Sequence, residues 1–148
     1  MASSPTWTAA DRVRIGHCAD YVLRTMRLYT ELMRGDPVRA LVFIAASRAG
    51  TQHLKDWMHD GEAGRFIPDE LRHSISISSL AQSLGLPVET TRRHVIALCA
   101  DGWAERTADG GVSIASRHLD KPELHATVEA NVINLGRLTR SLARAPRA

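Results

Sequence analysis

Residues 74–116 decide the fold of this chain, and they read SISISSLAQSLGLPVETTRRHVIALCADGWAERTADGGVSIAS. Apolar and polar residues alternate over residues 74–77, which predicts a short strand. A helix follows, with Ser76 or Ser78 as its N-cap, and its inward-facing residues are Leu80, Ala81 and Leu84. Gly85 supplies the left-handed backbone that a tight turn needs. The first half of the stretch therefore predicts a strand and a helix that ends in a sharp turn.

The second half predicts another helix and a hairpin. Pro87 opens a helix that runs to about Asp101 and ends at Gly102. Spacings of four and three place one set of side chains on its inner face: Thr91, Val95 and Leu98. We expect strands at 103–107 and 112–115, because Asp-Gly between two such runs is a strong hairpin signal.

This order of elements is typical of a winged helix-turn-helix, whose second helix fits the DNA major groove. The segment ISSLAQSLGLPVETTRRHVIALCADGWAER resembles the DNA-binding segment of bacterial winged-helix transcription regulators. Within it, TTRRHVIALCADGW is similar to the GntR family, whose Thr-rich, Arg-bearing recognition helix ends in Asp-Gly and a large residue. The resemblance implies that Thr90 and Arg92 face DNA and that Arg106 and the wing tip approach the backbone.

The layout of the whole chain is more similar to the MarR family, in which terminal helices flank a central winged domain and form the dimer interface. The wing departs from that family's pattern of an Asp and an Arg two residues apart followed by Leu-Thr. The segment RTADGGVSIASRHLD keeps Asp109 but has neither the Arg nor the Leu-Thr pair. The regulator family therefore stays open between the two.

The flanking residues predict helices on both sides within one domain spanning 1–148. We expect a disordered tail at 1–9, N-terminal helices within 11–73, the winged helix-turn-helix at 74–116 and a C-terminal helix at 121–144. Asp36-Pro37 begins a strongly apolar helix that extends to about His59, with Gly50 as a weak point. A loop is expected at 60–66 and one helical turn at 68–72. The fold class is thus mainly α with a small β-hairpin.

Both outer helices carry apolar stripes that a small winged domain cannot cover alone. The stripes consist of Ile15, Ala19, Val22, Met26, Tyr29 and Met33 in the first helix and Leu124, Val128, Val132, Leu135, Leu138 and Leu142 in the last. We expect them to form a two-fold homodimer interface. The alternative is that both stripes pack within one chain.

Composition limits the remaining classes of protein. An apolar fraction of 44% and a charged fraction of 24% are ordinary for a globular domain. The net charge of +3 says little about DNA, and the preference for Arg over Lys has a base-composition explanation as well as a functional one. The chain has no signal-peptide pattern and no membrane-length apolar run, and Cys18 and Cys99 do not make a disulfide framework. We therefore expect a cytoplasmic protein without membrane association.

The candidate DNA-binding residues lie on the two helices and the wing, and the ordinary alternative for this surface is a solvated charged face. They are Ser78, Ser79, Glu89, Thr90, Arg92, Arg93, His94 and Arg106.

A small-molecule pocket could be lined by Trp57, Met58 and Phe66, although such residues more often belong to a core. The spacing of His53, Asp56, His59 and Asp60 is compatible with a metal, but nothing completes a tetrahedral set, so no metal is expected. Cys99 could sense oxidation, but it lies in an apolar helix without an activating partner.

Together these features predict a sequence-specific transcription regulator that binds a palindromic operator in double-stranded DNA as a homodimer. A small-molecule effector is left open, and no cofactor is expected. The chain has no phosphate-binding Gly loop, nucleophile elbow or Cys-x-x-Cys motif, so an enzyme is not expected. The alternative is a winged-helix module that binds proteins and no longer binds DNA.

Overall fold

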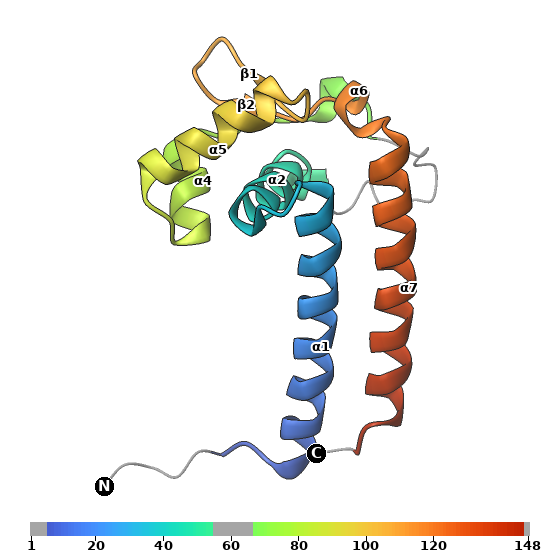
Figure 1. The fold of residues 1–148 in the computed structure, drawn as a ribbon. Helices are drawn as coiled ribbons and strands as arrows, with labels where there is room; N and C mark the ends of the chain where they lie inside the picture. The colour runs from blue at the N-terminus through green and yellow to red at the C-terminus, as the bar shows by residue number, and fades with distance from the viewer. Residues whose placement is uncertain (1–5, 55–66, 147–148) are drawn as a thin grey trace, which may run out of the picture.

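The computed structural model describes residues 6–54 and 67–146, which are mainly helical with a small two-stranded antiparallel sheet (Figure 1). The α-helices are α1 (Ala9–Leu32), α2 (Pro37–Ala49), α4 (Ile77–Leu84), α5 (Val88–Ala100), α6 (Ser116–Leu119) and α7 (Pro122–Arg144). Two 3₁₀ turns are η1 (Gln52–Leu54) and η2 (Asp69–Leu71), and the strands are β1 (Glu105–Arg106) and β2 (Val112–Ser113).

Two regions stand apart in this fold. The long helices α1 and α7 run antiparallel as a pair, while α2, α4, α5 and the hairpin form a compact head at one end of that pair (Figure 1). We call these regions the helix pair and the head. Lys121 joins them, because its Nζ lies 3.8 Å from the centre of the Trp103 ring and donates to the Asp101 carbonyl oxygen at 3.3 Å.

Helix α2 is the centre of the head. Asp36 caps it by accepting a hydrogen bond from the Arg39 backbone N–H at 2.9 Å, and Pro37 occupies its first turn, as expected. Its buried residues are Ala40, Val42, Phe43 and Ala46. Phe43 meets Trp103 edge to face, with ring centres 5.5 Å apart, so the start of the hairpin packs on α2.

The structure corrects several predicted boundaries. The expected strand at 74–77 is reduced to one bridge between Ile75 and Val112, because Ser76 already caps α4 and Ile77 begins it. Helix α2 ends at Ala49 instead of near His59. Directly after this end, the Gly50 carbonyl accepts a hydrogen bond from the His73 N–H at 3.0 Å. The hairpin strands are shorter than expected and pair Glu105 with Ser113 and Arg106 with Val112.

The remaining expectations about helices are mostly confirmed. The turn at 68–72 forms as η2, and α7 begins at Pro122, one residue after its expected start, and ends at Arg144 as expected. Helix α6 was not expected, because its four residues are too short to show a period. No helix in the described ranges is long and apolar enough to cross a membrane.

Candidate nucleic-acid interface

A tight turn joins α4 to α5. Ser76 caps α4 by accepting the Ser79 backbone N–H at 3.0 Å, and Gly85 adopts the expected left-handed conformation with a φ of 64°. The Leu86 N–H donates to the Ala81 carbonyl at 3.0 Å, which closes the turn. The two helices therefore leave the turn at a defined angle.

Helix α5 is divided into an inner and an outer face, as its sequence predicts. Thr91, Val95 and Leu98 are all 0% exposed. The Thr91 hydroxyl also donates to the Pro87 carbonyl at 3.1 Å, which satisfies it inside the core. Because these three side chains point inward, the opposite side of α5 faces solvent.

The outer face carries two arginines and one carboxylate. Arg92 is held by Glu89, with 3.0 Å between Nε and Oε1. Arg93 is exposed, and no ion pair joins it to another described residue. Thr90 is partly exposed at the edge of this face. Arg93 is therefore the arginine of α5 that is free to bind an external anion.

Ile96 belongs to the same outer face, although it was not among the predicted residues. It is 56% exposed and lies three positions after Arg93 and four after Arg92. An apolar side chain on this surface can contact a thymine methyl group or an apolar partner. Its helical spacing from the two arginines was the signal that could have identified it.

His94 lies elsewhere than the prediction placed it. Its side chain is 19% exposed, and Nδ1 is 3.4 Å from Asp36 Oδ2 at the start of α2. Asp36 also faces Arg39, which reaches Asp101 at 2.9 Å. His94 therefore belongs to the contact between α2 and α5, and a single helical period could not show this because the partner is far away in sequence.

The hairpin tip is stabilised by Asp109. This carboxylate accepts the Gly111 N–H and the Ser74 hydroxyl, each at 3.1 Å, and also the Thr107 hydroxyl. The Thr107 hydrogen bond, together with those from Gly111 and Ser74, lowers the pKa of Asp109. Arg106 donates to the Gly110 carbonyl at 2.6 Å. The tip thus holds a negative charge beside the predicted Arg106 contact.

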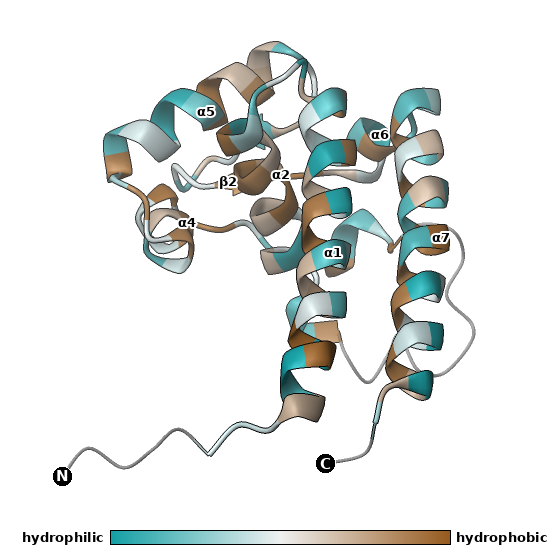
Figure 2. Cartoon of the chain, turned by 60° about the horizontal axis from the view of Figure 1, so that its bottom comes forward, coloured by the Kyte–Doolittle hydropathy of each residue, from teal (hydrophilic) through white to brown (hydrophobic). Residues whose placement is uncertain are grey.

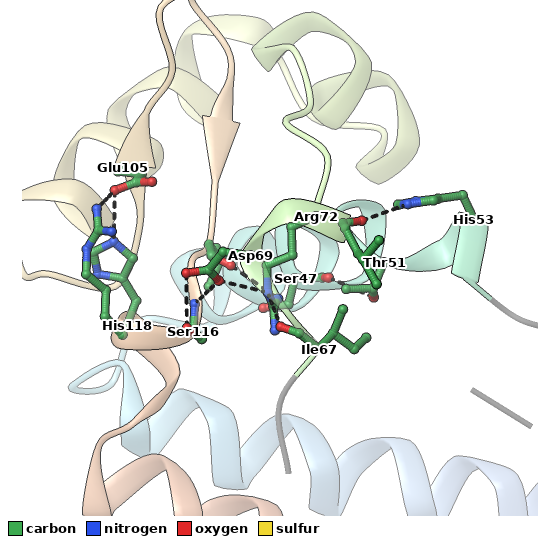
Figure 3. Close-up of polar contacts among 12 residues, drawn as sticks. Ser47, Thr51, His53, Ile67, Asp69, Arg72, Glu105, Ser116 and His118 are labelled. Atoms are coloured by element: carbon green, nitrogen blue, oxygen red, sulfur yellow. Dashed lines mark hydrogen bonds and ion pairs between the residues drawn. The ribbon is translucent and has the colours of Figure 1, made fainter. Parts of the chain in front are cut away.

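The base of the hairpin is tied to α6 by a histidine (Figure 3). His118 lies 3.0 Å from the Gly102 carbonyl through Nδ1 and 3.4 Å from Glu105 Oε2 through Nε2, and Arg117 also pairs with Glu105. Burial lowers the pKa of His118, and the neighbouring cations Arg117 and Lys121 lower it further. These contacts couple the hairpin to α6, which directly precedes α7.

A second tie lies beside it in Figure 3, and sequence reasoning found neither. Asp69 accepts the Ser116 N–H at 2.6 Å and its hydroxyl at 3.1 Å, and the backbone bond from Ser116 lowers the pKa of Asp69. Arg72 is nearly buried and donates to the carbonyls of Ile67 at 3.1 Å and Ile114 at 3.2 Å. These partners lie up to 47 residues apart, so no local pattern announces them.

The other predicted sites are the serines at the start of α4, the small-molecule pocket, the possible metal ligands and Cys99. Ser78 and Ser79 are exposed in the first turn of α4, where Ser79 also bonds Ser76. The pocket residues Trp57, Met58 and Phe66 lie outside the described residues, as do Asp56, His59 and Asp60.

His53 stacks on His73 at 3.7 Å between ring centres, and the described residues hold no group of three potential metal ligands. Burial raises the pKa of the Cys99 thiol, which disfavours the reactive thiolate.

One apolar cavity lies where the head meets the helix pair. It has a volume of about 380 Å³, and its walls include Tyr29, Phe43, Leu119, Leu124 and Val128. Ser47 also borders it and has a buried hydroxyl with no hydrogen-bond partner among the described residues. The cavity is large enough for a small ligand.

Comparison of the chain with models of known protein families, with curated proteins and with solved structures finds no match.

Proposed function

We propose that this protein is a sequence-specific DNA-binding transcription regulator whose head is a winged helix-turn-helix. The observation that carries the proposal is the division of α5, with three fully buried residues on one side and exposed Arg93 on the other. A helix held through its inner face after a tight turn can enter a major groove with its outer face. The small hairpin beside it is the proposed wing.

The two arginines have different proposed roles. Arg93 has no carboxylate partner among the described residues and is free to grip a phosphate or the two acceptors of a guanine. Arg92 must first leave Glu89, so its net contribution to binding is smaller. Thr90 and Ile96 can read thymine methyl groups, whereas His94 takes no direct part.

The helix pair is the proposed dimer interface. Large apolar side chains are exposed along one side of both long helices: Ile15 and Val22 of α1, and Val128, Val132 and Leu135 of α7. A second copy of the chain would cover much of this surface. A two-fold dimer places its recognition helices on half-sites about 34–36 Å apart.

The apolar cavity beside Phe43 is a proposed effector site in this scheme. A ligand there contacts α2 of the head and α7 of the helix pair together. A ligand that prefers one arrangement of these regions shifts the spacing of the recognition helices. This part of the proposal depends on the dimer.

The proposal is tested by measuring affinity for a mixed-sequence duplex over a range of salt concentrations. Each lost phosphate contact should flatten the slope of log K against log salt by about 0.9. We expect Arg93→Gln to weaken binding and flatten the slope if it holds a phosphate. Arg144→Gln, which removes the same charge at the far end of α7, should change neither.

The exposed Val88 and Ile96 favour a second candidate, a module that binds proteins through α5. The same assay separates the two candidates. Folded protein that binds no duplex at low salt would contradict DNA binding and favour the interaction module.

A further inference from the structure

The helix pair has two unlike sides. Helical spacing puts Ile15, Val22, Val128, Val132 and Leu135 on one side of the two helices. A second stripe, which contains Arg24, Arg27, Asn134 and Arg137, lies more than a quarter turn around the helices from these apolar residues. It lines a groove between α1 and α7, which is separate from the head and from the apolar cavity.

Arginines dominate this groove. A cavity of about 330 Å³ is lined by Arg24, Arg27, Arg137 and Asn134, with the apolar side chains of Leu28 and Ile133 beside them. Arg24, Arg137 and Asn134 also line an adjoining cavity of similar volume, which Asp20 borders. Arg27 pairs with Glu31 at 3.2 Å, but no ion pair joins Arg24 or Arg137 to another described residue. Even with Asp20 and Glu31 counted against the three arginines, the groove holds an excess of positive charge.

Asn134, which lines the same groove, has an unpartnered polar atom. The residue is only 3% exposed, and its Nδ2 donates to the Tyr21 carbonyl at 3.1 Å and to the Thr25 hydroxyl at 3.0 Å. Because a carbonyl can only accept, this contact fixes the orientation of the amide. Asn134 Oδ1 is then buried with no hydrogen-bond donor among the described residues.

A buried acceptor without a donor is costly. Arg24, Arg27 and Arg137 are exposed and solvated, and they supply positive charge near that acceptor. One ligand can use both features. Its anionic group would lie between Arg24 and Arg137, and its hydroxyl or amino group would donate to Asn134 Oδ1. Leu28 and Ile133 would cover a short apolar part.

We propose that the groove between α1 and α7 binds a small organic anion whose carboxylate or phosphate lies next to a hydrogen-bond donor. The site is distinct from the proposed DNA-binding and effector surfaces and does not depend on either. Arg24 and Arg137 supply the charge, and Asn134 distinguishes a hydroxylated anion from its deoxy counterpart.

The test uses two matched pairs of anions, citrate with tricarballylate and malate with succinate. Within each pair the carboxylates are the same and only one hydroxyl differs. Binding to the full chain is measured by titration calorimetry at constant ionic strength, with inorganic phosphate as a further probe. We expect a hydroxylated anion to bind at least tenfold more tightly than its partner.

Two variants locate the binding. Arg24→Gln and Arg137→Gln should each weaken it at least tenfold, whereas Arg144→Gln, outside the groove, should leave it unchanged. Without ligand, the Arg137→Gln protein should melt no lower than the parent, because the variant removes unpaired charge. This melting curve also shows that the variant folds.

Three results would overturn the proposal. The first is that none of these anions binds at millimolar concentration. The second is equal affinity within both pairs. The third is that the groove variants change the oligomeric state but not anion affinity, which would assign the groove to a second copy of the chain.

Discussion

The head and the helix pair contain similar apolar periodicity but use it differently. In the head, the inward stripe of α5 is fully covered by α2 and α4, as Val95 and Leu98 show. In the helix pair, by contrast, Val132 is 62% exposed and Ile15 is 61% exposed. Figure 2 shows the distribution of hydropathy along both helices. An apolar stripe predicts that another element will pack on that face of the helix. It does not indicate whether that element belongs to the same chain or to a second copy.

This difference separates two kinds of stability. The core of the head is complete within one chain, so its contribution to folding should not depend on protein concentration. The part of each predicted stripe nearest the head packs into this core, as Met33 and Leu124 show, whereas the exposed remainder contributes only when a partner covers it. Matched substitutions in the two regions can test this contrast.

The largest expected effect is in the head. Leu98→Ala should lower the free energy of unfolding by about 2–5 kcal/mol, because it opens a cavity in the core between α5 and α2. The matched change Leu135→Ala in α7 should alter the stability of the monomer by about 0.5 kcal/mol or less. Chemical denaturation at low protein concentration measures both, and equal losses would remove the contrast.

The next effect concerns association. Val132→Asp should weaken the proposed dimer by about 3 kcal/mol or more, over a hundredfold, because each protomer buries an unpaired carboxylate. Sedimentation equilibrium measures the change, with Arg144→Gln as a surface control. A dimer that persists unchanged would show that another surface forms it.

A smaller effect is expected at the start of α4. Ser76→Ala should cost about 1 kcal/mol, because it removes the oxygen that accepts the Ser79 N–H. Ser78→Ala is the matched control, since Ser78 is exposed in the first turn of the same helix. Thermal unfolding of the two variants should separate them, and equal melting temperatures would argue against the cap.

The smallest effect is a dependence on pH. Burial lowers the pKa of His118 below its ordinary value of 6.5, so the unfolded chain takes up the proton more readily than the folded chain. The contribution of this group to stability is therefore complete above about pH 6.5 and declines as the pH falls below it. His118→Gln should flatten the stability profile between about pH 7 and 5. An unchanged slope would show that His118 does not cause it.

Local signals predicted much of the head. Gly85 marks the turn, Asp36-Pro37 marks the start of α2, and the spacing of Thr91, Val95 and Leu98 gives the inner face of α5; the structure confirms all three. These signals succeed because the residues that produce each of them lie within a few positions of one another.

Features that depend on distant partners were not predictable. His94 turned toward Asp36 of α2, and Arg72 and Asp69 reached across more than 40 residues to Ile114 and Ser116. The polar set around Asn134 joins helices more than 100 residues apart. Helical spacing shows which side of a helix a residue occupies but not which element lies opposite it.

In the proposed function, the head reads DNA while the helix pair joins two copies. Selection of the purified protein against a random duplex library at physiological salt, followed by sequencing, tests both halves together. We expect a palindromic motif whose half-sites lie about one helical turn apart, and we expect Arg93→Gln to abolish its recovery. Folded protein that recovers no motif would show that the head does not read DNA, and a single half-site would argue against the dimer.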